Sequence, residues 1–390
     1  HLRDLGPVIR PIGDSSRVRT SCVPFFFSYK KANLNLMDVK GKKVFVGMSG
    51  GVDSSVSAAL LKEQGYDVTG VFIRVWQPDF TPCDWREERR DAMRVAAQLD
   101  IPFKTYDFRD EYKKEVVDYM IKEYREGRTP NPDVMCNRYV KFGSFLQKAI
   151  QEGADFIATG HYVRNEDGKL LAGRDDNKDQ SYFLWTLNQD DLKKIIFPIG
   201  EMEKPKVRKE AEKLNLHNAN KKDSQGICFV GKIDVKEFLK NYIDSKEGNV
   251  LNEAGEVVGK HDGATFLTFG QRHGFTITKK TPNDKPYYVV GKNVDKNTII
   301  VSNELKRKEF GSTRKGVEIE RVNWISGEIP NLDKKYRARL RYRQNLRDCK
   351  VEANNNKIEI VFDELQENVT SGQSLVLYDG EICLGGGVIF

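Results

Sequence analysis

A short loop rich in glycine and serine is the first feature of this sequence that could do chemistry. Residues 49–55 read SGGVDSS and stand between a short apolar stretch and a stretch with helical spacing. Glycine lets the backbone approach an anion without a Cβ clash, and a helix amino terminus presents N–H groups and the positive end of its dipole. The loop therefore predicts phosphate binding rather than a plain capped turn, and Asp53 could cap the helix or hold Mg²⁺. Because it lacks the Lys-Ser/Thr ending of a Walker loop, γ-phosphate transfer is not implied.

Two cysteines stand in surroundings that could make them reactive. Cys136 follows Asp133 by three residues, in a proline-stiffened loop expected to lead into a helix, and Arg138 and Lys141 come just after it. A helix start and nearby cations lower the pKa of a thiol, so Cys136 is either a nucleophile or an inert core thiol. Cys228 lies in a polar stretch with glycine, where we expect a loop, and a buried structural thiol is again the alternative. No close cysteine pair exists, so a zinc site is not expected; the other cysteines are Cys22, Cys83, Cys349 and Cys383.

Strands and helices that alternate along the first half of the chain must position these residues. Apolar and helical spacing predicts strands at 43–48, 67–76, 103–106 and 155–159, and helices at 54–63, 87–99, 111–125 and 141–151. Repeated βαβ units predict a parallel sheet with helices on both faces. Ligands of such sheets bind at the carboxyl ends of the strands, which is where the loop at 49–55 begins.

The second half changes to short strands separated by glycines. The expected strands are 256–259, 287–291 and 298–301, and then 317–325, 335–343, 357–362, 374–378 and 381–389, which fit a small antiparallel barrel. At 335–343, four arginines fall at period two and so share one strand face; they are Arg337, Arg339, Arg341 and Arg343. With no acidic partner on that face, it is either solvated or binds an anion such as RNA.

The length and the net charge of the chain limit the number of domains and the classes of partner that can be expected. The chain has 390 residues, which predicts two or three domains. Its net charge is +7, but residues 1–36 hold six basic residues against two acidic ones, so bulk charge does not argue for RNA. We expect 1–36 to be a tail without a catalytic role, or else an organellar transit peptide, which would make the protein mitochondrial rather than cytoplasmic. No apolar run approaches the roughly 20 residues that cross a bilayer.

Several motifs in the same order resemble the tRNA-specific 2-thiouridylase family, from about residue 37 to 390. The loop at 49–55 alone is shared by all pyrophosphate-loop ATPases, which transfer AMP and release pyrophosphate. The further matching segments are 129–143, 159–162, 178–184, 222–230, 268–274, 285–289, 341–344 and 383–387. The resemblance implies an α/β fold, with a parallel-sheet pyrophosphate-loop catalytic domain at 37–230. A small mixed central domain at 231–311 and an antiparallel β-barrel at 312–390, which contacts tRNA, would follow.

The resemblance also implies the reaction. ATP adenylates the C2 oxygen of the wobble uridine 34, a cysteine persulfide supplies sulfur, and 2-thiouridine, AMP and pyrophosphate result. Cys228 would carry the persulfide, Cys136 would be the second catalytic cysteine, and Asp133 a base or orienting carboxylate. A Cys136–Cys228 disulfide would form during turnover, whether the persulfide attacks directly or hydrosulfide is released first. Both routes require the two cysteines to approach within disulfide distance.

The family's ligand contacts carry over to matching positions. ATP would contact Gly47, Met48, Ser49, Gly50, Gly51, Val52, Asp53, Ser54, Ile73 and Gly160. The target base would meet Asn131, Pro132 and Asp133, and the rest of the tRNA would meet His161, Lys178, Asp179, Gln180, Arg341, Tyr342 and Gln373. By the same resemblance the tRNAs are those for Lys, Glu and Gln, and a cysteine desulfurase or a relay protein donates the sulfur.

Two other functions fit parts of the sequence. Another adenylating pyrophosphate-loop enzyme, such as a lysidine or amide-forming synthetase, would need the loop but not Cys136 or Cys228. A protein that binds RNA and uses nucleotide only as a switch would form no AMP.

Overall fold

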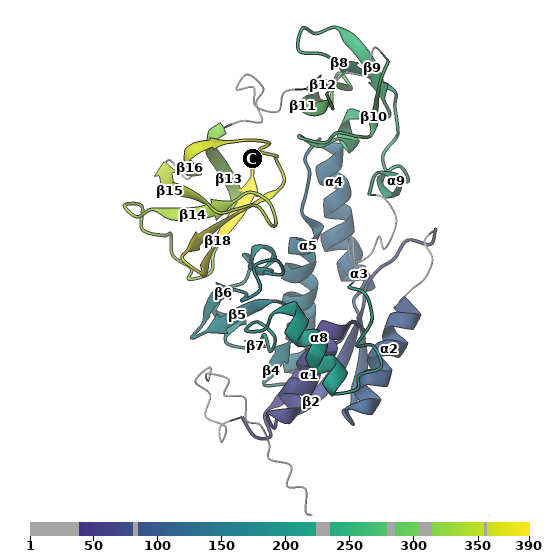
Figure 1. Cartoon of the computed structure of the whole chain (residues 1–390), viewed down its shortest axis with the longest axis vertical. Coiled ribbons are helices and arrows are strands. Elements are labelled where there is room, and N and C mark those ends of the chain that lie inside the picture. The colour runs from purple at the N-terminus through teal and green to yellow at the C-terminus, as the bar shows by residue number, and fades with distance from the viewer. Residues whose placement is uncertain (1–38, 81–84, 224–234, 279–284, 304–313, 355–356) are drawn as a thin grey trace, which may run out of the picture. The chain divides into compact units, whose positions relative to one another are not determined.

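The computed structural model describes residues 39–80, 85–223, 235–278, 285–303, 314–354 and 357–390 (Figure 1). The chain divides into two units, His1–Leu34 and Asn35–Phe390. The expected tail at 1–36 lies outside the described residues, as do Cys22, Cys83 and Cys228. Within the described part, no helix has the length and apolar character needed to span a membrane.

A five-stranded sheet, parallel throughout, forms the base of the first half. Its order is β3-β2-β1-β4-β7, with β1 Lys43–Gly47, β2 Asp67–Arg74, β3 Phe103–Asp107, β4 Phe156–Ala158 and β7 Ile195–Ile196. The four expected strands are all present, which confirms the predicted parallel sheet. The chain runs outward from β1 to β3 and then returns to β4 on the other side of β1. The strand order therefore reverses between β1 and β4, where doubly wound sheets bind their ligands.

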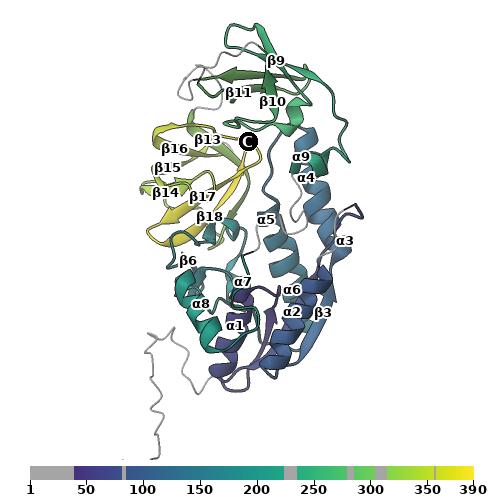
Figure 2. The ribbon, with the colours of Figure 1, turned by 45° about the vertical axis from the view of Figure 1, so that its right-hand side comes forward.

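Helices cover both faces of this sheet (Figure 2). On one face, α1 Val52–Glu63, α2 Trp85–Gln98 and α8 Lys204–Lys213 bury small apolar residues such as Val56, Val95 and Val207. On the other face, two long helical segments pack around Phe45 and Ile157. The first consists of α3 Arg109–Tyr112, a π-helical stretch Lys113–Asp118 and α4 Tyr119–Arg125, and corresponds to the helix expected at 111–125.

The second long segment begins earlier than expected. It consists of α5 Pro132–Met135, a π-helical stretch Cys136–Ser144 and α6 Phe145–Gln151, whereas the sequence predicted a loop up to residue 141. Pro132 sits in the first turn, where its missing N–H costs nothing, and Asn131 Oδ1 accepts the Val134 N–H at 3.4 Å. Helix caps thus replace the expected loop, and Cys136 lies within a continuous helical segment.

The central part is a small mixed sheet. Its order is β10-β9-β8-β12-β11, with β8 Gly248–Leu251, β9 Val257–His261, β10 Phe275–Ile277, β11 Tyr288–Asn293 and β12 Thr298–Ser302. Only β8 and β12 pair in parallel among the described strands of this sheet. A core of Val250, Leu267, Val289 and Val301 holds it together.

Six antiparallel strands form the C-terminal barrel. They are β13 Arg314–Trp324, β14 Tyr336–Arg339, β15 Arg347–Asn354, β16 Lys357–Gln366, β17 Ser374–Asp379 and β18 Ile382–Ile389. The barrel closes because β13 pairs with both β16 and β18. Its sheet continues through β18 into the hairpin of β5 Val163–Glu166 and β6 Lys169–Ala172, which belongs to the first half of the chain.

The expected barrel is confirmed, but the expected strand at 335–343 is wrong beyond Arg339. The chain turns there, since the Gln344 N–H donates to Arg341 O at 3.2 Å and Arg343 adopts a φ of 63°. The strand β15, rich in charged residues, was not expected. The predicted face of four arginines without an acidic partner does not exist, because Arg339 pairs with Asp179 at 3.1 Å.

Candidate functional site

The loop at 49–55 closes on itself between β1 and α1. The Ser49 N–H donates to Ser54 Oγ at 3.2 Å, and Ser55 Oγ donates to Gly51 O at 2.8 Å. Gly50 has a φ of +76°, and a Cβ at this position would clash with the carbonyl oxygen of Glu88. The N–H groups of the first turn of α1 have no acceptor within the helix. The loop and the first turn of α1 thus offer the N–H groups that an anion would bind.

Three predicted nucleotide contacts from separate segments gather around this loop. Gly160 follows β4, and a Cβ there would lie 2.7 Å from Ser54 N. A Cβ on Gly47 would lie 3.8 Å from Ile73 Cδ1. The carboxyl ends of β1, β2 and β4 thus bring the loop, Ile73 and Gly160 into one place.

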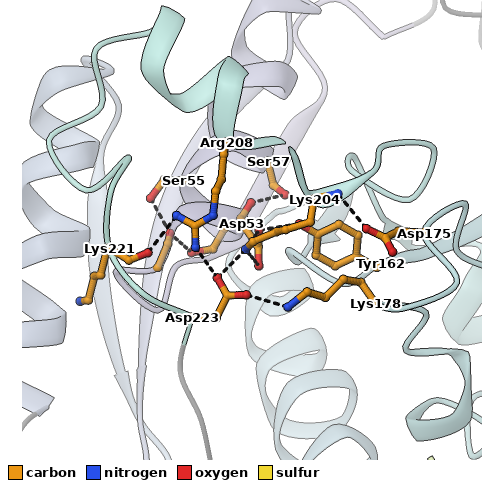
Figure 3. Close-up of polar contacts among 12 residues, drawn as sticks. Asp53, Ser55, Ser57, Tyr162, Asp175, Lys178, Lys204, Arg208, Lys221 and Asp223 are labelled. Atoms are coloured by element: carbon orange, nitrogen blue, oxygen red, sulfur yellow. Dashed lines mark hydrogen bonds and ion pairs between the residues drawn. The ribbon is translucent and has the colours of Figure 1, made fainter. Parts of the chain in front are cut away.

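Asp53, in the first turn of α1, binds a buried lysine (Figure 3). Lys204 Nζ donates to Asp53 Oδ1 at 2.7 Å and to Oδ2 at 2.9 Å, and the Tyr162 hydroxyl donates to Oδ1 at 2.7 Å. Burial, together with the negative charge of Asp53, raises the pKa of Tyr162, which stays a hydrogen-bond donor. Sequence reasoning assigned a role to neither partner, although Tyr162 lies in the matching segment 159–162.

The arrangement at Asp53 does not fit a preformed Mg²⁺ site. Both carboxylate oxygens already accept hydrogen bonds from Lys204, and the described residues contain no group of three Asp, Glu, His or Cys side chains that could hold a metal ion. A hard dication prefers six or more oxygen ligands or waters.

Asp223 lies in the same cluster and binds three cations. Its carboxylate accepts Lys178 Nζ at 2.7 Å, Lys204 Nζ at 2.7 Å and Arg208 Nη2 at 2.9 Å. Although burial acts to raise it, the hydrogen bonds with Lys178 and Lys204 lower the pKa of Asp223 to about 2. Lys204 and Arg208 are four residues apart on α8 and therefore share one side of the helix. This spacing was the signal in the sequence that could have found them.

The helical segment that carries Asp133 and Cys136 lies next to the loop at 49–55. Gly160 contacts Ser54, and the next residue, His161, stacks its ring 5.6 Å from that of Phe142 in the stretch Cys136–Ser144. His161 Nδ1 lies 2.7 Å from Thr159 Oγ1, and burial holds its pKa well below 6.5, so its ring is neutral at pH 7. The pair Gly160-His161 thus links the loop to this segment.

Cys136 is buried rather than exposed at the start of a helix. Only 3% of it is accessible, and it forms part of the core between the sheet and the long helices. Burial raises the pKa of Asp133, against the opposing charge of Lys141. The expected partner Cys228 lies outside the described residues.

The three expected tRNA contacts at 178–180 have partners within the chain. Lys178 binds Asp223. Asp179 is buried and accepts the N–H groups of Gly173 and Ser181 at 3.1 and 3.0 Å. Gln180 Oε1 accepts the Tyr162 N–H at 2.9 Å.

The remaining expected contacts lie where the barrel meets the segment before α5. Gln373 Nε2 donates to the carbonyl oxygens of Thr129 and Pro130 at 2.8 and 3.1 Å. Arg341 Nη2 donates to Thr370 Oγ1 at 2.8 Å and to Asn368 O at 3.0 Å, and Tyr342 stacks on Phe183 with ring centroids 4.5 Å apart. Gln373 thus lies next to the residues before Asn131, whereas Lys178 belongs to the cluster around Asp223.

Models of three protein families match almost all of the chain. They are described as the tRNA methyl transferase HUP domain, over residues 42–232, the tRNA methyl transferase PRC-barrel domain, over 236–303, and the aminomethyltransferase beta-barrel domain, over 314–389.

Similar proteins in bacteria carry a more specific name. The chain is 44% identical over 362 residues to the tRNA-specific 2-thiouridylase MnmA of Streptococcus thermophilus strain CNRZ 1066, which covers 91% of this chain and 96% of that protein. It is 45% identical over 355 residues to the protein of the same name from Pseudomonas paraeruginosa, covering 89% and 94%.

Solved structures give weaker and partial matches. The U34-tRNA thiolase NcsA from Methanococcus maripaludis matches with a TM-score of 0.34 and 21% identity, over 49% of this chain and 62% of that one. A 4-thiouridine synthetase in complex with RNA and bound ATP matches with a TM-score of 0.32 and 20% identity, over 51% and 50%.

Proposed function

This chain belongs to the tRNA-specific 2-thiouridylase family, and we propose that it is the tRNA sulfurtransferase that replaces the C2 oxygen of wobble uridine 34 with sulfur. The observation that carries the proposal is the contact of Gly160-His161 with both the loop at 49–55 and the segment that bears Cys136. Activation of a carbonyl and delivery of sulfur to it require adjacent sites for nucleotide and thiol. The proposed division into catalytic, central and barrel domains at 37–230, 231–311 and 312–390 is retained.

The nucleotide half of the proposal is adenylation. Oxide is a poor leaving group, whereas AMP leaves readily, so transfer of AMP to the C2 oxygen would make C2 attackable. The N–H groups at the start of α1 and the close approach at Gly50 and Gly160 support binding of the ATP phosphates here. Lys204 binds both carboxylate oxygens of Asp53, so Mg²⁺ would be held mainly by the ATP phosphates and by water.

The sulfur half of the proposal rests on Cys136 and Cys228. The terminal sulfur of a persulfide on Cys228 would attack C2 and displace AMP. The Cys136 thiolate would then attack the Cys228 sulfur, which leaves the terminal sulfur on C2 and forms a Cys136–Cys228 disulfide. In the alternative, Cys136 first releases hydrosulfide, which attacks C2. Both routes balance only if a reductant then returns the disulfide to two thiols. Asp133, partly buried in the helical segment that also carries Cys136, would orient the base or accept its proton.

The expected tRNA contacts remain proposals in two groups. Gln373 hydrogen-bonds the segment that leads to Asn131, which supports a role near the target base. Arg341 binds Thr370 in the same barrel loop as Gln373, and Tyr342 stacks on Phe183. Lys178 adjoins the Asp223 cluster instead. The tRNAs for Lys, Glu and Gln, and a cysteine desulfurase or relay protein as sulfur donor, are proposed as partners from the resemblance.

The test combines the purified chain with ATP, a cysteine desulfurase with cysteine, and unmodified tRNA. Thiolated nucleoside is measured by mass spectrometry and AMP by chromatography. We expect both products from the native chain, and no 2-thiouridine from Cys136→Ser or Cys228→Ser, because each removes a sulfur that both routes need.

Cys349→Ala, in the barrel core, is the matched control and should retain thiolation. Full thiolation by either active-site variant would refute the cysteine roles. AMP formation without thiolation by the native chain would instead favour another adenylating enzyme.

A further inference from the structure

Three cationic side chains converge on the single carboxylate of Asp223. Lys178, Lys204 and Arg208 all bind Asp223, and only Lys204 is shared with a second carboxylate, that of Asp53. Asp175 supplies a third carboxylate, whose Oδ2 accepts the backbone N–H of Lys204 at 2.9 Å. The carboxylates of the chain thus balance the three cations, and the convergence of the cations on one point is the informative feature.

The position of these cations is as informative as their number. Lys204 Nζ reaches the Asp53 carboxylate in the first turn of α1, so the cations stand beside the N–H groups of the loop at 49–55 (Figure 3). The side chain of Lys204 is only 10% exposed, which makes its charge weakly screened. Ammonium and guanidinium groups that converge on one point are the typical binding partners of phosphate oxygens.

We propose that Lys178, Lys204 and Arg208 form the subsite for the β- and γ-phosphates of ATP, and hence for pyrophosphate, and that Asp223 is the internal anion that a phosphate group displaces from it. This inference rests on the proposed function, because it extends the nucleotide site. The loop at 49–55 and the cation subsite would then bind successive parts of one triphosphate.

A purely structural cluster is the alternative. Arg208 Nη1 also donates to the carbonyl oxygens of Ala219 and Lys221, both at 3.2 Å, so part of its role is to hold the chain before Asp223. The two roles predict opposite changes in anion affinity when the charge of Asp223 is removed. If Asp223 competes with phosphate, removing its charge strengthens anion binding; if the cluster only holds the chain, the same change weakens binding or leaves it unchanged.

The test is calorimetric titration of the full chain with inorganic pyrophosphate, and with AMP in parallel. Asp223→Asn keeps the shape of the side chain and removes its charge, and we expect pyrophosphate to bind roughly fivefold more tightly, on the order of one charge-assisted contact. Lys204→Met should weaken pyrophosphate binding about tenfold. AMP affinity should not change in either variant, since AMP lacks the phosphates assigned to this subsite.

Lys206→Met is the matched control, because Lys206 lies between Lys204 and Arg208 on α8 but is 64% exposed and pairs with Glu203. It should bind pyrophosphate as the native chain does. Weaker or unchanged binding by Asp223→Asn in a protein with native thermal stability would overturn the inference. If Asp223→Asn lowers the stability, native pyrophosphate affinity in Lys204→Met would overturn it. Binding of pyrophosphate needs neither tRNA nor sulfur, so failure of thiolation would refute the proposed function separately.

Discussion

At the scale of single residues, the protein interior decides how each ionisable group behaves. Asp133 is partly buried, and burial raises its pKa while Lys141 opposes the shift. His161 is fully enclosed by Phe142, Phe197 and the strand end, and burial keeps it neutral. A neutral imidazole can hydrogen-bond a base or ribose but brings no positive charge to a phosphate.

The raised pKa of Asp133 yields a prediction with opposite effects on stability and activity. Above the unfolded value of 3.8, the carboxylate is less favourable in the folded chain than in the unfolded one, so its ionisation lowers the free energy of unfolding. Asp133→Asn removes that penalty. We expect an unchanged or higher free energy of unfolding at pH 7 in urea melts, and a thiolation kcat lower by about 100-fold or more.

Asp190→Asn is the control for this change, since Asp190 is exposed and pairs only with Lys193 among the contacts described for it. It should alter neither quantity. A native kcat in Asp133→Asn would show that this carboxylate has no part in the reaction.

At the scale of elements, the conformation of the loop at 49–55 depends on close packing with neighbouring segments as much as on its own residues. Gly50 lies against the backbone of α2 at Glu88, and Asn218 Nδ2 donates to Gly50 O at 3.0 Å and to Ser55 Oγ at 2.9 Å. The loop is therefore held from both sides by segments distant in sequence.

Two glycines with similar backbone angles make it possible to measure the effect of backbone strain apart from the effect of close packing. Gly50 has a φ of +76° and Gly65 a φ of +92°, but a Cβ on Gly65 would meet no atom within 4 Å. Alanine at either position should cost ~1–2 kcal/mol from backbone strain alone. We expect only Gly50→Ala to abolish ATP binding in calorimetry and to destabilise the chain further in urea melts. Equal effects of the two variants would mean that the contact with Glu88 does not matter.

At the scale of the whole unit Asn35–Phe390, the barrel hydrogen-bonds the chain that leads to α5, the helix with Asp133. Besides the two bonds of Gln373, the Thr129 N–H donates to Ser371 O at 2.9 Å, and a Cβ on Gly372 would lie 2.9 Å from Thr129 N. Glu123, fully buried on α4, pairs with Arg321 of β13 at 3.1 Å. The barrel thus supports Asn131 and Asp133 from outside the first half of the chain.

Gln373→Glu tests this support, because glutamate cannot donate to the two carbonyl oxygens. Its cost should be roughly 1–3 kcal/mol for each carbonyl left without a donor. We expect kcat for thiolation at saturating tRNA to fall roughly ten- to 100-fold as Asp133 is misplaced. Steady-state kinetics separates this from the loss of a tRNA contact, which would raise KM and spare kcat.

Gln344→Glu is the matched control, because Gln344 uses its Oε1 to accept the Leu340 N–H at 2.9 Å, and glutamate keeps that acceptor. It should leave kcat unchanged. A normal kcat with a raised KM in Gln373→Glu would remove the supporting role.

The parallel sheet, the barrel, the glycine-rich loop at 49–55 and the family can all be read from the sequence, because hydrophobic periodicity, glycine patterns and motif order are local or linear properties. It could also nominate Asp133 and Cys136, which stand three residues apart in one motif. It failed where a cap or a turn overrode periodicity, as at Asn131-Pro132, which start a helix, and beyond Arg339, where the chain leaves the strand.

Polar partners that are distant in sequence meet only in the folded chain. Arg339 pairs with Asp179 across 160 residues, and Lys204 pairs with Asp53 across 151 residues. Gln373 hydrogen-bonds the backbone of Pro130 across 243 residues. No pattern in one sequence encodes such pairs, since each depends on how strands and helices stack. Packing of α8 against α1 places Lys204 beside Asp53, and packing of the long helices on the other face of the sheet buries Cys136.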